Sequence, residues 1–87
     1  MKTQVLEKAV ELCGGQSELA RRLRAILPGD KVGQVHVWKW LNRVVGPVPP
    51  AKYVIPICQV VEWQITPNAL RSDLYPHPND GLPAEFR

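Results

Sequence analysis

The sequence of 87 residues contains no apolar run that approaches the ~20 residues needed to span a bilayer. Its first twelve residues, MKTQVLEKAVEL, are amphipathic and include two glutamates, which excludes a secretory signal peptide. We therefore expect a cytoplasmic protein, which would be associated with the nucleoid if it binds DNA.

Cysteine is scarce, with Cys13 and Cys58 each falling within an apolar helical pattern. One pair is too few for the disulfide scaffold of a small secreted protein, and no CxxC spacing suggests zinc. The two histidines, His36 and His77, also lack further ligands at zinc spacing. The sequence predicts two buried thiols in a reducing compartment and no metal or other cofactor.

Catalytic patterns are missing as well. There is no glycine-rich phosphate loop and no nucleophile elbow, and neither Ser17 nor Ser72 has a base nearby in the sequence. A chain this short usually needs a partner to build an enzyme pocket. We expect a binding protein and not an enzyme.

Acidic residues are nearly absent from the middle of the chain. Between Leu19 and Val61, Asp30 is the single acid, whereas the flanks hold the other acids. The seven basic residues of this stretch are Arg21, Arg22, Arg24, Lys31, Lys39, Arg43 and Lys52. Such a basic region is typical of a protein with a polyanionic partner, although a merely solvated helical face has the same composition.

What the sequence does contain is helical periodicity and strong helix breakers. Apolar residues recur at helical spacing in segments 3–13, 16–26, 33–44 and 51–62, and a short helix is predicted after Thr66-Pro67. Glycines at 14–15, Pro28-Gly29-Asp30 and the proline-rich stretch 46–50 separate them. Pro56 implies either a kink in the fourth helix or a later start. We predict an all-α domain over residues 1–75, with four to five helices, and an extended or disordered proline-rich tail over 76–87.

Short helices with a basic middle suggest a helix-turn-helix, in which the second helix crosses the DNA backbone and the third enters the major groove. In the third helix, Val37, Trp40 and Leu41 form one apolar stripe, which predicts that they pack on the core. Trp38 stands two positions from Trp40, so both cannot be core. The expected base-contacting residues are Gln34, Val35, Trp38 and Lys39.

The sequence also resembles a known family. Residues 14–23 (GGQSELARRL), 34–41 (QVHVWKWL) and 65–76 (ITPNALRSDLYP) are similar to the motifs of the Cro/YdaS-type regulators of phages and prophages. The resemblance implies a compact lambda-repressor-like helix-turn-helix fold and operator binding in a bacterial or phage setting. It implies phosphate contacts from Gln16 and Ser17 and base contacts from the third helix.

One segment departs from the family pattern. The turn between the two helices, residues 24–32, is several residues longer than the usual three to four. We expect the longer turn to change the angle between the helices and to bring Arg24 and Lys31 to the DNA backbone. The full set of expected backbone contacts is Gln16, Ser17, Arg21, Arg24, Lys31, Asn42 and Arg43.

Several functions remain open at this point. The first is a Cro-like repressor that binds a palindromic operator of double-stranded DNA as a homodimer, because one small module rarely buries enough DNA surface alone. The alternatives are a DNA-binding antitoxin that represses its own operon and has a toxin partner, or a protein-interaction adaptor on the same fold. Trp63, Tyr53 and the segment 73–76 are candidates for a dimer interface.

Overall fold

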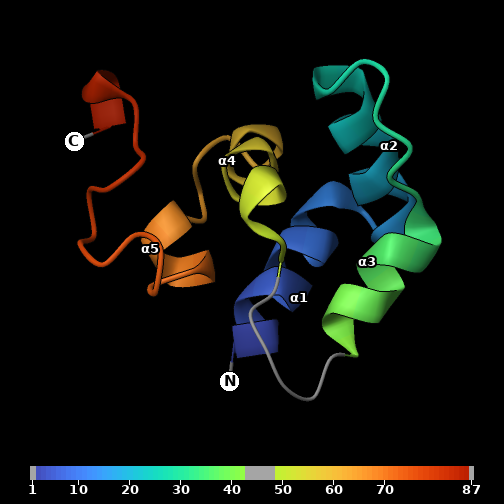
Figure 1. Cartoon of the computed structure of the whole chain (residues 1–87), viewed down its shortest axis with the longest axis horizontal. Coiled ribbons are helices and arrows are strands. Elements are labelled where there is room, and N and C mark those ends of the chain that lie inside the picture. The colour runs from blue at the N-terminus through green and yellow to red at the C-terminus, as the bar shows by residue number, and fades with distance from the viewer. Residues whose placement is uncertain (1, 43–48, 87) are drawn as a thin grey trace.

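The computed structural model describes residues 2–42 and 49–86, and all regular structure within these ranges is helical (Figure 1). This confirms the predicted all-α class. The elements are α1 (Lys2–Cys13), α2 (Gln16–Ile26), α3 (Gln34–Leu41), α4 (Ala51–Val60), α5 (Pro67–Leu70) and the 3-10 helix η1 (Ala84–Phe86). The longest has twelve residues, and no helix in the described ranges has the length and apolarity of a membrane span.

Two glycines, Gly14 and Gly15, separate α1 from α2, as the sequence predicts. Leu6, Ala9 and Cys13 form the buried stripe of α1. Gly14 and Gly15 have φ angles of 96° and 131°, and both backbone N–H groups donate to the Val10 carbonyl, at 3.1 and 2.9 Å. Only glycine adopts such φ angles without steric cost, so the chain can reverse within two residues.

The core forms where α2 packs against both α3 and α4. Leu19 and Leu23 of α2 and Val37 of α3 are fully buried there. The ring of Trp40 lies 4.9 Å from that of Tyr53, measured between centroids. Tyr53 is therefore a core residue of α4, and its small exposed surface makes it a poor candidate for a dimer interface.

Helix α4 begins at Ala51, as predicted, and carries Pro56 in its interior. Proline cannot donate a backbone hydrogen bond, so one helical bond is lost there, while burial of the ring contributes to the core. The helix ends at Val60, slightly before the predicted Glu62, and Glu62 and Trp63 follow with positive φ angles of 56° and 62°. Positive φ at two successive non-glycine residues turns the chain sharply out of the helix.

The short helix α5 has the predicted cap. Thr66 is the N-cap, its hydroxyl oxygen accepts from the Ala69 N–H at 3.1 Å, and Pro67 occupies the first helical position. Arg71 follows the helix and is only 6 % exposed. Its guanidinium donates to both carboxylate oxygens of Asp73, at 2.9 and 2.6 Å, and to the Pro49 carbonyl at 3.0 Å.

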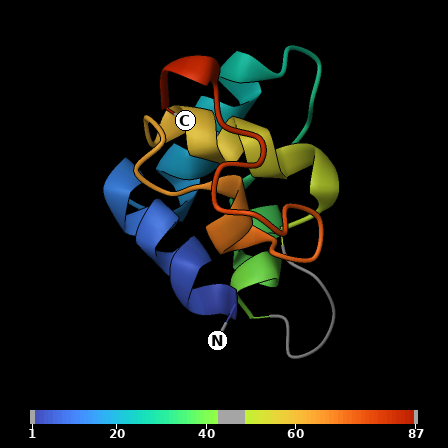
Figure 2. The same cartoon turned by 90° about the vertical axis from the view of Figure 1, so that its left-hand side faces the viewer.

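The C-terminal segment, residues 71–86, follows a folded path, whereas the sequence predicted an extended or disordered tail over 76–87. It forms turns from His77 to Gly81 and ends in η1, and Leu82 is buried. The rings of Phe86 and Trp63 are 6.2 Å apart. In Figures 1 and 2 this segment runs beside α4 and α5, on the side of the molecule away from α2 and α3.

Both cysteine thiols are buried, which confirms the sequence prediction. Burial in an apolar environment disfavours the thiolate, and it raises the pKa of Cys58 to about 12. The pKa of Cys13 is also raised, chiefly by burial. Both side chains therefore act as small apolar core residues.

Candidate nucleic-acid interface

Helix α3 presents two chemically different sides. Val37 is fully buried and Trp40 is 6 % exposed, so these two anchor the helix on the core. On the opposite side Val35 is 57 % and Trp38 is 50 % exposed, and Gln34 and Lys39 are also exposed. The structure thus brings the four expected base-contacting residues onto one outward face.

This outward face contains a shallow depression lined by Gln34, Val35 and Trp38. Val35 and Trp38 adjoin each other here, and neighbouring exposed apolar side chains are typical of a surface that a partner covers. The combination of an amide, an aliphatic group, an indole and an ammonium group matches the mixed polar and methyl surface of base edges in the major groove.

A hydrogen bond between side chains joins α2 and α3 at the start of each helix. The Gln34 Nε2 group donates to the Oε1 atom of Gln16 at 2.5 Å. The bond uses one N–H of Gln34, so its second N–H and its carbonyl oxygen stay available to a ligand. Ser17 is exposed beside Gln16, at the N-terminal end of α2 where backbone N–H groups favour an anion.

The basic surface of α2 is partly neutralised within the helix itself. The carboxylate of Glu18 pairs with Arg21 and, at 3.5 Å, with Arg22. The hydrogen bond from Arg21 is the largest cause of the lowered pKa of Glu18. Glu18 directly precedes the basic stretch from Leu19 to Val61, so it was not counted there. The positive charge that α2 offers to a polyanion is therefore smaller than its three arginines alone suggest.

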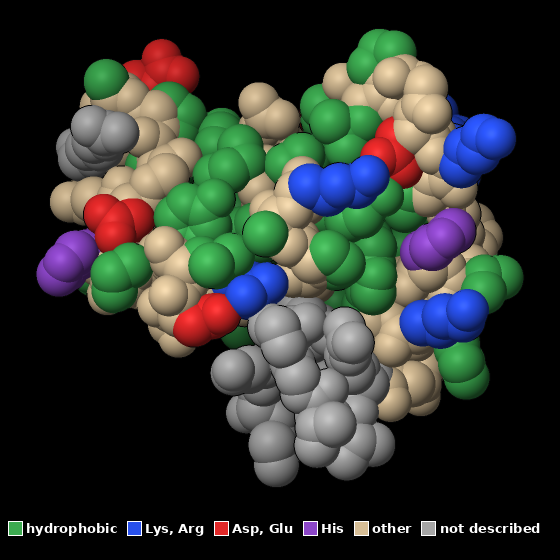
Figure 3. Space-filling model, in the orientation of Figure 1, with side chains coloured by type: hydrophobic (Ala, Val, Ile, Leu, Met, Phe, Trp, Pro, Cys, Tyr) green, Lys and Arg blue, Asp and Glu red, His purple; other side chains and the backbone are tan. Residues whose placement is uncertain are grey.

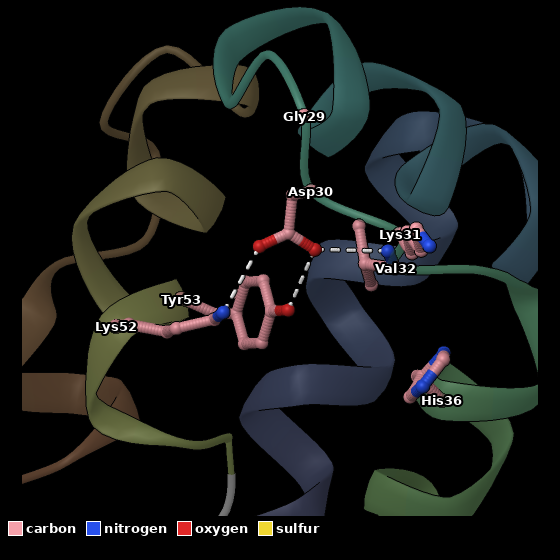
Figure 4. Close-up of a pocket in the computed structure, with 7 residues that line it drawn as sticks. All are labelled: Gly29, Asp30, Lys31, Val32, His36, Lys52 and Tyr53. Carbon is pink, nitrogen blue, oxygen red and sulfur yellow. Dashed lines mark hydrogen bonds and ion pairs between the residues drawn. The ribbon is translucent and has the colours of Figure 1, made fainter.

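The long turn between α2 and α3, residues 27–33, is held against α4 by a single carboxylate (Figure 4). One oxygen of Asp30 accepts from the Val32 N–H at 2.9 Å and from the Tyr53 hydroxyl at 2.8 Å. The other oxygen lies 3.0 Å from the ammonium group of Lys52. We call these four residues the Asp30 clamp.

The Asp30 clamp shifts the pKa of its members in the directions that these contacts require. Donation by the Tyr53 hydroxyl and the Lys52 ammonium lowers the pKa of Asp30. The bond from Lys52 to Asp30 raises the pKa of Lys52. Burial raises the pKa of Tyr53, and the hydrogen bond from its own hydroxyl to Asp30 raises it further. At neutral pH the carboxylate is therefore ionised, and both of its oxygens have partners.

Arg24 ties the same turn to the end of α2. Its Nη1 group donates to the Val32 carbonyl at 2.7 Å, while the side chain stays exposed. Because α2 ends at Ile26, the extra residues form a true loop rather than a further helical turn. Arg24, expected to contact the DNA backbone, also positions the turn that carries Lys31.

The remaining expected backbone contacts have different surroundings. Lys31 is exposed, and in the described part of the chain neither it nor Lys39 takes part in an ion pair. Asn42 is exposed at the end of α3, where its Nδ2 group donates to the Trp38 carbonyl at 2.8 Å. Arg43 lies outside the described residues.

Sequence reasoning missed two parts of this surface. The Asp30 clamp joins positions 23 residues apart, which no local pattern reveals. His36, set aside as an isolated histidine, caps α3 by accepting from the Gly33 N–H at its Nδ1 atom, at 3.0 Å. The position of His36, three residues after the cap residue Gly33, is the signal that could have revealed this role.

Comparison with known proteins agrees with this architecture. Residues 6–79 match the family described as "Bacterial toxin YdaS". The chain belongs to the YdaS toxin family. The match covers α1 from Leu6 onwards and the whole of α2, the long turn, α3, α4 and α5. No curated protein and no solved structure matches the chain.

Membership of the YdaS family confirms the resemblance found in the sequence motifs. It identifies the chain as a small phage-type regulator or a protein related to toxin–antitoxin systems. The match ends at residue 79, within the C-terminal segment. The division at residue 75 into a DNA-binding domain and a tail stays a prediction.

Proposed function

We propose that this protein is a transcriptional regulator that binds a specific double-stranded DNA operator through α3. The two-sided character of α3 carries the proposal: Val37 and Trp40 fix the helix on the core, while Trp38 is half exposed on the other side. The major groove is wide enough to admit one α-helix, so this face can reach base edges. The protein would act by binding and not by catalysis.

Three exposed residues of α3 each suit a particular contact. Gln34, oriented by Gln16, retains a donor and an acceptor, which is the pair that an adenine edge requires. Val35 can contact a thymine methyl group, and Lys39 can reach a guanine or a phosphate. The backbone N–H groups at Gln16 and Ser17 would bind the phosphate that sets the register of the complex.

We also propose that the protein binds its operator as a homodimer, because one small module buries little DNA surface. Trp63 is a candidate for the interface, since it is partly exposed and its ring lies 6.2 Å from that of Phe86 in the C-terminal segment. Figure 1 shows this segment on the side of the molecule away from α3. Light scattering of wild type and Trp63→Ala tests this. An unchanged molar mass in the variant would remove Trp63 from the interface.

The proposal is tested by binding to a labelled fragment of the region upstream of the gene, against a scrambled duplex, at two salt concentrations. We expect selective binding that weakens steeply with salt, since phosphate contacts release counterions. Gln34→Ala should relax selectivity, and Lys39→Ala should weaken binding. Gln59→Ala and Lys8→Ala are the matched controls, as both residues are exposed on other helices.

Equal and weak binding to both duplexes would overturn the proposal. The adaptor function would then lead, or the antitoxin function if a partner toxin co-purifies and restores binding.

The family description favours a second candidate, a toxin that arrests growth through the same DNA-binding face. Induced expression of wild type, Gln34→Ala and Lys39→Ala in a bacterial host tests it. Growth arrest that both substitutions relieve would support this candidate. Arrest that persists in both variants would place the toxic activity elsewhere on the molecule.

A further inference from the structure

The exposed face of α3 is bordered by Gln34 on one edge and by His36 on the other, and the function proposed above gives His36 no role. With about 100° per residue in an α-helix, Gln34 and His36 lie on opposite edges of the face centred on Val35 and Lys39. Gln34 points toward α2, where it bonds to Gln16. His36 is exposed on the other edge, next to the long turn.

The hydrogen bond of His36 fixes which of its nitrogens carries the proton. Its Nδ1 atom accepts from the Gly33 N–H at 3.0 Å and must be unprotonated. In the neutral ring the proton is then on Nε2. Because Gly33 has no side chain to cap α3, this contact holds the imidazole in place with its Nε2–H directed away from the helix end.

The surroundings of His36 suit an acceptor on DNA. His36 lines a hollow together with Lys31, Lys52 and Tyr53, between the long turn and α4 (Figure 4). Within this hollow Asp30 and Lys52 neutralise each other, and Lys31 supplies the remaining positive charge. Figure 3 shows a histidine over α3 among basic side chains on this side of the molecule.

From this geometry we infer that His36 is a further specificity-determining residue: its Nε2–H donates to an acceptor on a base edge, while Lys31 contacts the adjoining phosphate. The acceptors available in the major groove are guanine O6 and N7, adenine N7 and thymine O4. The long turn thereby widens the recognition surface beyond the α2 edge. This inference rests on the proposed DNA-binding function.

Two substitutions separate the role of His36 as a helix cap from its proposed role as a donor to a base edge. In His36→Asn the side-chain oxygen occupies the place of Nδ1, so the cap survives and the Nε2 donor is lost. In His36→Gln the amide nitrogen occupies the place of Nε2, so the donor survives. His77→Asn is the matched control, because His77 is exposed in the C-terminal segment.

The experiment selects duplexes from a pool with a randomised centre, using wild type and each variant, and measures melting temperatures in parallel. We expect His36→Asn to melt like wild type, to bind the duplex selected by wild type about threefold to tenfold more weakly, and to lose base preference at one position. His36→Gln should keep most of the affinity, and His77→Asn should match wild type.

Unchanged affinity and preference in His36→Asn would show that His36 only caps the helix, and would overturn the inference. Equal weakening for all sequences would also overturn it, since it would indicate a phosphate contact. If wild type itself selects no sequence, the proposed function fails, and the inference fails with it. If wild type selects a sequence that His36→Asn selects equally well, only the inference fails.

Discussion

The long turn at residues 27–33 and the C-terminal segment at residues 71–86 both lack long helices, yet they are anchored by opposite means. The turn is anchored by an acid, Asp30, whose oxygens accept from three donors near the surface. The C-terminal segment is anchored by a buried base, Arg71, and by the buried side chain of Leu82. The Asp30 side chain is 13 % exposed, and one of its three donors is the exposed ammonium group of Lys52. The Arg71 side chain is 7 % exposed and donates to a buried carbonyl, so loss of its contacts should cost more.

The comparison suggests that the two anchored segments serve different purposes, one DNA binding and the other stability. The turn lies beside the exposed residues of α3, so its anchor should matter most for DNA binding. The C-terminal segment packs beside α4 and α5, so its anchors should matter most for stability. The predictions below test this division, from the largest expected effect to the smallest.

Arg71→Met should have the largest effect on stability. The substitution leaves the buried Pro49 carbonyl without its donor and removes both bonds to Asp73. We expect a loss of about 2–3 kcal/mol in the free energy of unfolding, measured by urea denaturation. Arg22→Met is the control, since the ion pair of Arg22 with Glu18 is partly exposed. Equal denaturation midpoints for the two variants would contradict the buried anchor.

Gly81→Ala and Gly29→Ala form a matched pair. Both glycines have positive φ, 78° and 88°, so each alanine carries a similar backbone strain. At Gly81 the new methyl would also meet Pro67, Ile55 and Tyr75 at 2.9 to 3.0 Å, whereas nothing lies within 4 Å at Gly29. Gly81→Ala should therefore destabilise the fold by about 1–2 kcal/mol more than Gly29→Ala. A difference near zero would show that the C-terminal segment does not pack closely.

Asp30→Ala should show the reverse pattern to Arg71→Met. We expect a decrease of a few degrees in melting temperature but a several-fold loss of DNA affinity, because the turn that holds Lys31 beside His36 loses its anchor. Lys52→Ala removes the ion pair with Asp30 and the contact of the ammonium group with the Tyr53 ring, but it leaves the Tyr53 and Val32 bonds to Asp30 in place. Because the Lys52 side chain is exposed, we expect a smaller decrease in melting temperature than for Asp30→Ala. Melting curves and DNA titrations of both variants measure the two effects. A large loss of stability with normal DNA affinity would reverse the proposed division.

The smallest effect expected is a pH dependence of stability. Folding lowers the pKa of Asp30 below its ordinary value of 3.8. Ionised Asp30 therefore stabilises the fold at pH values above 3.8, and this stabilisation is lost as the pH falls through the pKa that Asp30 has in the folded protein. Melting temperatures of wild type and Asp30→Ala, recorded from neutral pH into that acid range, should converge. Curves that stay parallel would show that the clamp does not depend on ionised Asp30.

Much of the fold could be predicted from the sequence because the signals are local. The apolar spacing in α1 and α2, the glycines at 14–15 and the pair Thr66-Pro67 depend on neighbouring residues, and each is confirmed. The same spacing placed Trp40 in the core and Trp38 outside it, which the structure confirms. Local geometry alone decides these features, so residue order is enough to reveal them.

Tertiary structure alone decided the rest. The Asp30 clamp, the bond between Gln16 and Gln34, and the anchoring of Arg71 on the Pro49 carbonyl join residues 18 to 23 positions apart. Burial of Leu82 likewise depends on a surface that only packed helices provide. A hydrogen bond needs both partners within about 3 Å, and residue order does not reveal which distant groups meet at that distance.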